Sequence, residues 1–116
     1  MKILRIFVLL TISLYAETVR DLKYDSKHER NTLDFYPALK KGEKPAPVFV
    51  WFHGGGFRNG DKNQIEKYGR PTLEKYQKAG YAVVSCNYPF LGKDMEYRDI
   101  VDHCGRAVKF VRSQSK

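Results

Sequence analysis

The stretch VFVWFHGGGFRNGDK, residues 48–62, places an apolar run directly before a histidine and three consecutive glycines. Val48 to Phe52 is apolar without alternation, which is typical of a central strand buried on both faces and covered by helices. Glycine loses more backbone entropy on folding than any other residue. Three glycines at the end of a strand therefore need a conformational or functional reason.

Most common uses of a glycine cluster do not fit this one. A dinucleotide fingerprint needs G-x-G-x-x-G, and a P-loop needs a Gly-Lys-Ser/Thr end; neither spacing occurs here. A plain turn requires neither three glycines nor a preceding histidine. An oxyanion hole remains, because glycines let backbone N–H groups face a developing negative charge, as in the HGGG motif of lipases and esterases.

The flanking sequence predicts an α/β fold. Residues 17–36 alternate polar and apolar side chains around the polar stretch 25–32, which predicts two antiparallel strands, with Asp34 on the polar side. Pro37 ends the second strand, since proline cannot donate to the ladder. The glycine stretch is followed by a polar segment, a helix, a buried strand and a second helix, so a βαβα unit with parallel strands is expected.

The bounds of the later elements come from start and stop signals. The first helix begins near Pro71 and stops at Gly80, and the next strand covers Tyr81 to Cys86. Residues 90–98 form a loop, and the second helix runs from about Asp99 to Val111. Its apolar face is predicted to consist of Ile100, Cys104, Ala107, Val108 and Val111.

Four segments together resemble the N-terminal part of an α/β-hydrolase fold esterase. The most similar branch contains the hormone-sensitive-lipase-like esterases and the feruloyl and acetyl-xylan esterases. Their order in the chain matches the family's. They are Tyr24…Leu33-Asp34-Phe35-Tyr36-Pro37, the block from Pro47 to Lys62, GYAVVSCNY at residues 80–88, and the helix from Asp99 to Val111.

The resemblance implies roles for the residues of the glycine loop. The amides of Gly55 and Gly56 would line the oxyanion hole, His53 and Gly54 would support the loop, and Phe57 would flank the acyl pocket. The implied substrate is a small-molecule or carbohydrate-linked ester. No cofactor and no metal are expected.

The chain departs from the family at the nucleophile. The family's serine lies in a G-x-S-x-G elbow, and none of the five serines has that context. Ser85 falls in a strand expected to be buried, and His28 and His103 are interpreted as surface or helix-flank residues. We therefore interpret residues 17–116 as a partial hydrolase domain, truncated or split before the nucleophile strand and inactive alone. A complementing C-terminal polypeptide would be its partner.

A function of another class stays open at this point. The chain could be a non-catalytic, secreted binding or interaction module, in which the glycine loop forms an anion or carbonyl pocket. In either case Val48 to Phe52 would lack one neighbouring strand, and an exposed apolar edge of this kind favours association.

The basic charge does not indicate a nucleic-acid partner. The formal net charge is +8, but the lysines and arginines, Lys62 and Lys67 among them, are scattered between acidic and apolar neighbours. No arginine-rich stripe or aromatic-basic recognition motif occurs. The pattern favours a solvated basic surface.

Residues 1–16, MKILRIFVLLTISLYA, predict a signal peptide. A short positive region precedes an apolar run from Ile6 to Leu14, and Ala16 ends the segment. The run is shorter than the ~20 residues of a stable membrane span. We expect cleavage and a secreted or periplasmic location, with an uncleaved anchor or a buried helix as the alternatives.

The two cysteines, Cys86 and Cys104, would meet an oxidising compartment after export. A disulfide between them is then possible, but two buried, small hydrophobic side chains are slightly favoured. Neither cysteine has metal-ligand spacing.

Overall fold

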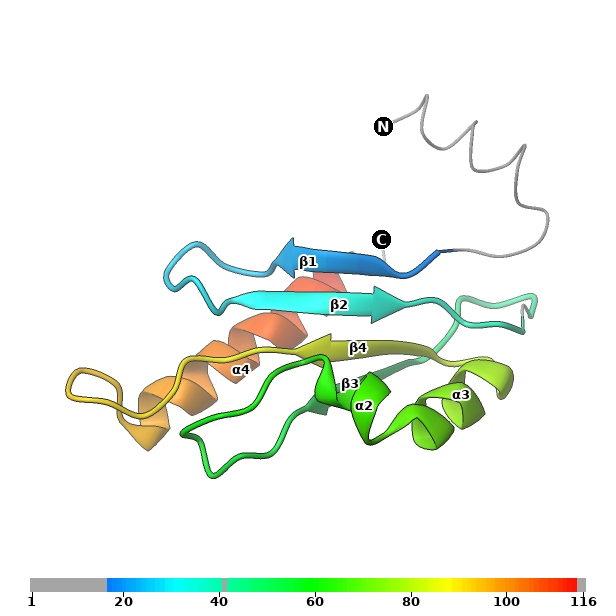
Figure 1. The fold of residues 1–116 in the computed structure, drawn as a ribbon. Helices are drawn as coiled ribbons and strands as arrows, with labels where there is room; N and C mark the ends of the chain where they lie inside the picture. The colour runs from blue at the N-terminus through cyan, green and yellow to red at the C-terminus, as the bar shows by residue number, and fades with distance from the viewer. Residues whose placement is uncertain (1–16, 41, 115–116) are drawn as a thin grey trace.

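A computed structural model describes residues 17–40 and 42–114. The elements are β1 (Val19–Lys23), β2 (Thr32–Tyr36), β3 (Val48–Phe52), α2 (Gln64–Lys67), α3 (Arg70–Lys78), β4 (Ala82–Cys86) and α4 (Tyr97–Ser113) (Figure 1). The signal peptide predicted for residues 1–16 lies outside the described residues.

The strands form one mixed sheet in the order β1-β2-β4-β3. β1 and β2 are antiparallel, and β2 is also antiparallel to β4. β3 and β4 are parallel, with Val50 opposite Val84. The sheet confirms the predicted α/β fold, in which an antiparallel pair is joined to a parallel βαβα unit.

Helices cover both faces of the sheet. On one face, Val84 and its buried neighbours pack with Ala107 and Phe110 of α4. On the other, Val83 packs with Ile65 of α2 and Leu73 of α3. Figure 1 shows the two short helices on one side of the sheet and the long α4 on the opposite side. Adjacent residues of β4 serve opposite cores because strand side chains alternate between faces.

The two parallel strands differ in burial. Every residue of β4 is buried, as expected for a central strand. The apolar run of β3 is typical of a central strand, but β3 lies at the end of the described sheet, as expected for a chain in which it lacks one neighbouring strand; its residues are half-buried except for the exposed Val48. Its apolar run reflects helices on both faces, which sequence cannot distinguish from a central position.

The predicted α3 is confirmed, with a proline in its first turn and a stop at Gly80, which has a φ of 97°. α2 was not predicted. It has only four residues and lies in the stretch described from the sequence as a polar segment, although its Ile65 is buried.

The buried face of α4 differs from the prediction. The helix begins at Tyr97, two residues earlier than expected, with Glu96 and Asp99 forming a reciprocal capping box. Ile100 and Ala107 are buried as predicted, whereas Val108 is 39% exposed. The polar His103 is buried in this stripe instead, which overturns its interpretation as a surface or helix-flank residue.

Candidate active site

The glycine loop lies at the carboxyl edge of the parallel strands. His53 directly follows β3, and Asn87 directly follows β4, its parallel neighbour. In open α/β sheets, ligands bind outside the carboxyl ends of the strands. The chain therefore places its glycine loop at the edge of the sheet where binding sites are usual.

The loop turns through three consecutive residues with positive φ. The φ angles are 130° at Gly55, 63° at Gly56 and 63° at Phe57. A Cβ at Gly55 would lie 1.9 Å from the backbone oxygen of Asn59, so only glycine fits there. Gly56 has open space around it, but its φ disfavours any side chain. Gly54 has neither restriction in the structure.

This turn leaves two neighbouring amides without partners. The Gly55 carbonyl accepts hydrogen bonds from the amides of Arg58 and Asn59 at 3.1 and 3.2 Å, which fixes the turn. The amides of Gly55 and Gly56 donate to no residue in the described part of the chain, and both glycines are exposed. Two adjacent free donors on a fixed loop can bind an oxygen that carries negative charge.

His53 is buried against this loop. Its Nδ1 lies 2.7 Å from the Gly54 carbonyl oxygen, and its ring stacks on Tyr88 with centroids 4.3 Å apart. Burial lowers the pKa of His53, although the hydrogen bond to Gly54 opposes this shift. A buried, neutral ring with engaged nitrogens holds a loop in place and is poorly suited to be a general base.

Arg30 contacts the same loop and was not singled out from the sequence. Its Nε donates to the Tyr88 carbonyl at 2.8 Å, and its NH2 donates to the Gly60 carbonyl at 3.2 Å. The same NH2 lies 3.2 Å from His53 Nε2, and the guanidinium covers the Phe90 ring at 3.9 Å. No local pattern could have found this residue, because its partners lie 23 to 60 positions further along the chain.

Gly60 is a second residue whose role was missed. Its φ is 113°, and a Cβ there would lie 2.4 Å from both the Gly54 oxygen and His53 Nδ1. The residue therefore packs directly on the hydrogen bond between His53 and Gly54. Its position after an Asn, in a turn-forming Asn-Gly pair, is the available sequence signal.

The end of β4 holds the far side of the loop. The Ser85 hydroxyl donates to the Lys62 carbonyl at 2.7 Å, and the Lys62 amide donates to Asn87 Oδ1 at 2.8 Å. The Tyr88 hydroxyl donates to the carbonyl oxygen of His53. Ser85 is fully buried in this arrangement, so its hydroxyl ties the loop to the sheet.

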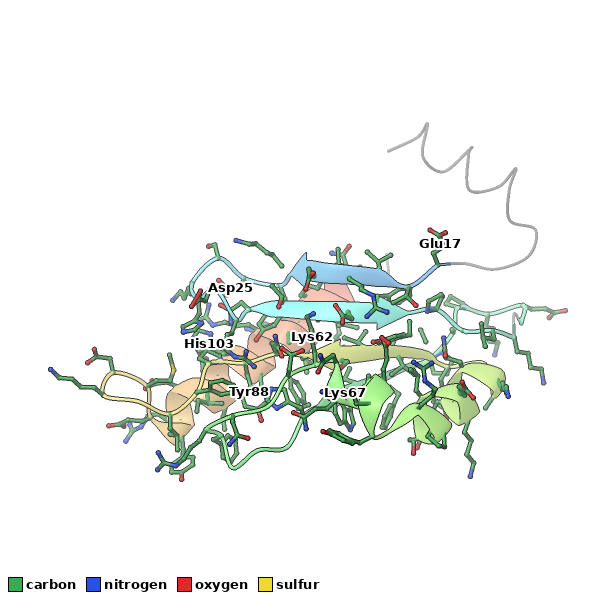
Figure 2. The ribbon with its side chains drawn as sticks, in the orientation of Figure 1. Glu17, Asp25, Lys62, Lys67, Tyr88 and His103 are labelled. Atoms are coloured by element: carbon green, nitrogen blue, oxygen red, sulfur yellow. The ribbon has the colours of Figure 1, made fainter. Side chains whose placement is uncertain are left out.

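Lys62 forms a buried ion pair. The prediction that it belongs to a solvated basic surface is therefore wrong for this residue. Its Nζ lies 2.9 Å from Asp34 Oδ1 and 2.7 Å from Asp21 Oδ1. Figure 2 labels Lys62 among the side chains of the molecule. Asp34 lies on the polar side of β2, as predicted, where it faces Lys62 and Arg20, but it is only 1% exposed. Burial disfavours the charged lysine, but the hydrogen bonds to the two aspartates outweigh it and raise the pKa of Lys62.

Phe57 lies beside the loop with its ring partly exposed. It contacts Tyr97 edge-on, with ring centroids 5.3 Å apart, and tilts against Tyr88 at 6.1 Å. Tyr97 also lines an open pocket of ≈ 640 Å³ with Arg58, Leu91 and further residues of the loop before α4. The acyl-pocket role of Phe57 stays a prediction.

Other chemistry-bearing residues lie apart from the loop or are inert. His103 Nδ1 lies 3.0 Å from Asn31 Nδ2, within a buried polar cluster. Cys86 and Cys104 are both free thiols, and burial raises the pKa of each, that of Cys104 to about 11.

Over residues 17–40 and 42–114, no three His, Cys, Asp or Glu side chains converge as metal ligands would. Over the same ranges, no helix has the length and hydrophobicity to cross a membrane.

The mixed sheet, its helices on both faces and the glycine loop after β3 define the N-terminal part of an α/β-hydrolase fold of the esterase type. The chain belongs to the BD-FAE family, whose family model matches residues 33–116. The comparison with curated proteins gave no match.

Solved structures similar to the chain include several esterases. Esterase B from Lactobacillus rhamnosis is 26% identical with a TM-score of 0.63, over 82% of this chain and 29% of that one. A truncated carbohydrate esterase from gut microbiota is 19% identical with a TM-score of 0.65, over 89% and 35%. An esterase from the planctomycete Thermogutta terrifontis is 22% identical with a TM-score of 0.63, over 84% and 34%. The chain thus spans about a third of the length of these proteins.

Proposed function

We propose that this chain forms the oxyanion-binding part of a carboxylic ester hydrolase, with the amides of Gly55 and Gly56 as the oxyanion donors. The observation that carries the proposal is the pair of adjacent, unpartnered amides on a loop held by His53 and Gly60. Membership of the BD-FAE family and the similarity to esterase B support it.

The proposed mechanism assigns this chain the stabilisation of the tetrahedral intermediate. As a nucleophile attacks an ester carbonyl, negative charge develops on its oxygen, and two pre-aimed amides lower the energy of that state. Each such donor is worth ~2.7–4 kcal/mol in known cases. His53 holds the loop, and Phe57 flanks the acyl group.

The attacking group is the element that this sequence does not provide. Residues 1–116 contain no G-x-S-x-G, and the buried Ser85 donates to the backbone. We therefore propose that the 116-residue chain alone does not turn over esters. A polypeptide carrying the nucleophile elbow would complete the site by pairing with the open edge of β3.

The proposed substrate is a small-molecule or carbohydrate-linked ester. The similarity to esterase B and to a carbohydrate esterase supports this class. The pocket of ≈ 640 Å³ beside the loop, which Tyr97 and Leu91 line, offers space for one side of such an ester.

A mixing experiment tests the proposal. The purified chain is assayed with p-nitrophenyl acetate alone, and then with the part of esterase B that follows the segment similar to this chain. We expect no turnover from either polypeptide and turnover from the mixture. Turnover by the chain alone, or a stable complex with no activity, would contradict it; ligand binding without turnover would favour a non-catalytic binding module.

We also propose that residues 1–16 direct export to a secreted or periplasmic location. The positive start, the short apolar run and the terminal Ala16 support this. Intact-mass measurement of the protein expressed with its leader should give a chain that begins at Glu17. A mass that retains residues 1–16 would indicate an uncleaved anchor.

A further inference from the structure

The partner of His53 Nε2 determines which ring nitrogen carries the proton. Arg30 NH2 lies 3.2 Å from Nε2, and a guanidinium has five donors and no acceptor. Nε2 must therefore accept. In the neutral ring the proton is then on Nδ1, which donates to the Gly54 carbonyl at 2.7 Å.

The position of this proton sets the direction of the next amide. In the trans peptide between Gly54 and Gly55, the N–H points opposite to the C=O. When Nδ1–H holds the Gly54 oxygen against the buried ring, the Gly55 N–H faces away from the ring toward solvent. The alternative Nε2–H tautomer would set a lone pair of Nδ1 against the Gly54 oxygen and a proton against Arg30.

We propose that Arg30 is a positioning residue that holds His53 in its Nδ1–H tautomer and so aims the Gly55 amide at the candidate oxyanion site. The functional meaning of this inference rests on the function proposed above. Arg30 also donates to the Gly60 carbonyl and to the Tyr88 carbonyl, so one guanidinium connects the histidine, the segment covering it and the end of β4.

The other two histidines of the chain provide an internal contrast. The Arg30 amide donates to His28 Nδ1 at 3.0 Å, so that nitrogen accepts. The His103 Nδ1 accepts from Asn31 Nδ2, because Asn31 Oδ1 already accepts from the His28 amide. Both rings therefore carry their proton on Nε2 when neutral, and His53 alone is expected to carry it on Nδ1.

Long-range ¹H–¹⁵N NMR of the full 116-residue chain, at about pH 8 where histidines are neutral, reads these tautomers directly. The variants are Arg30→Met, which keeps the apolar stem but cannot donate, and Arg30→Lys, which can. Arg106→Met is the matched control, because Arg106 pairs with Asp25 and Asp102 and contacts none of the loop.

The expected spectrum of the wild type shows one Nδ1–H ring and two Nε2–H rings. Arg30→Met should lose the exclusive Nδ1–H state of His53 and shift the Gly55 amide peak, whereas Arg30→Lys and Arg106→Met should retain both. An Nε2–H state of His53 in the wild type would overturn the inference. An unchanged His53 and Gly55 in Arg30→Met would do the same.

The dispersion of the backbone amide peaks reports whether a variant is folded, because Nε2–H is also the preferred tautomer of a histidine in an unfolded chain. If Arg30→Met does not fold, Arg30→Lys decides: a retained Nδ1–H supports the inference, and an Nε2–H His53 overturns it. No readout requires ester turnover, so a negative result here leaves the proposed function to its own mixing assay. Conversely, a mixing assay without turnover would leave the NMR result on the His53 tautomer unaffected.

Discussion

At the scale of single residues, the fold requires the three glycines of the loop to different degrees. Gly55 combines a φ of 130° with a backbone oxygen where its Cβ would be, and Gly56 has only the positive φ. Gly54 has open space and no such φ. The sequence motif treats the three alike, and only the structure shows which of them the fold itself requires.

Gly55→Ala and Gly54→Ala therefore form a matched pair. We expect Gly55→Ala to lower the free energy of unfolding by at least about 1–3 kcal/mol, the usual cost of a strained backbone conformation, because the collision with the Asn59 oxygen adds to that strain. Gly54→Ala should change it by less than about 0.5 kcal/mol. Urea denaturation measures both, and equal effects of the two substitutions would contradict this account of the turn.

Lys62 is the second residue whose environment has a measurable consequence. Lys62→Met leaves the buried Asp34 without its closest cation, and removing one partner of a buried pair costs ~3–5 kcal/mol. Arg20, at 3.6 Å from Asp34, compensates only partly. Lys67→Met is the exposed control and should be nearly neutral; denaturation midpoints that fall together would disprove the distinction.

Single-residue roles also mark the limit of what sequence can predict. The HGGG motif is local, so the position of the loop could be predicted from its spacing. The partners Arg30 and His53 lie 23 positions apart, and Asp34 and Lys62 lie 28 apart. Such pairings depend on strand order and on turn geometry, which no local pattern contains.

At the scale of elements, hydrophobic periodicity predicted whether a segment is a helix or a strand better than it predicted which of its residues are buried. β3 was found where its apolar run lies, yet a run covered by two helices resembles a central strand even at a sheet edge. In α4, the residue types favoured Val108 over His103 for the core. Asn31 reverses this choice, because its amide satisfies the buried imidazole.

The burial of two histidines predicts a pH dependence of stability. Burial lowers the pKa of His53 and of His103, so between their folded values and about 6.5 the unfolded chain binds more protons. The free energy of unfolding should therefore be fully developed above about pH 6.5 and fall as the pH is lowered toward 5.

Denaturation at several pH values checks this slope. His103→Gln removes one of the two titrating rings while retaining an acceptor for Asn31, and it should make the slope shallower. A stability that is flat over this range, or that rises as the pH falls, would contradict the burial of neutral histidines.

At the scale of the whole molecule, the two edges of the sheet differ in protection. β1 carries Arg20, Asp21 and Lys23, and its pairing with β2 is interrupted by a bulge between Val19 and Leu22. β3 is entirely apolar and pairs, among the described strands, with β4 alone. Charges and bulges on an edge oppose association, and a regular apolar edge favours it.

We therefore expect the purified chain to associate through β3. Val48→Lys adds a charge to that edge, and Val19→Lys adds the same charge to the opposite edge; both valines are exposed. Sedimentation velocity should show a shift toward monomer for Val48→Lys and little change for Val19→Lys. A wild-type chain that stays monomeric at all concentrations would refute this expectation.

The most direct measurement of the central claim is the rate of ester hydrolysis by a chimera. Residues 17–116 of this chain, which include Arg30 and all four described strands, replace the corresponding part of esterase B, so that one polypeptide carries both the glycine loop and a nucleophile. We predict hydrolysis by the chimera and a fall in kcat of up to ~10²–10³-fold for Gly55→Ala, because its Cβ would collide with the Asn59 backbone oxygen and turn the amide away from the oxyanion, a change at most as costly as losing the donor. Gly105→Ala, at a glycine of α4 with open space and away from the loop, is the control. A folded chimera without activity, or one whose kcat is indifferent to Gly55→Ala, would contradict the claim that this loop binds the oxyanion.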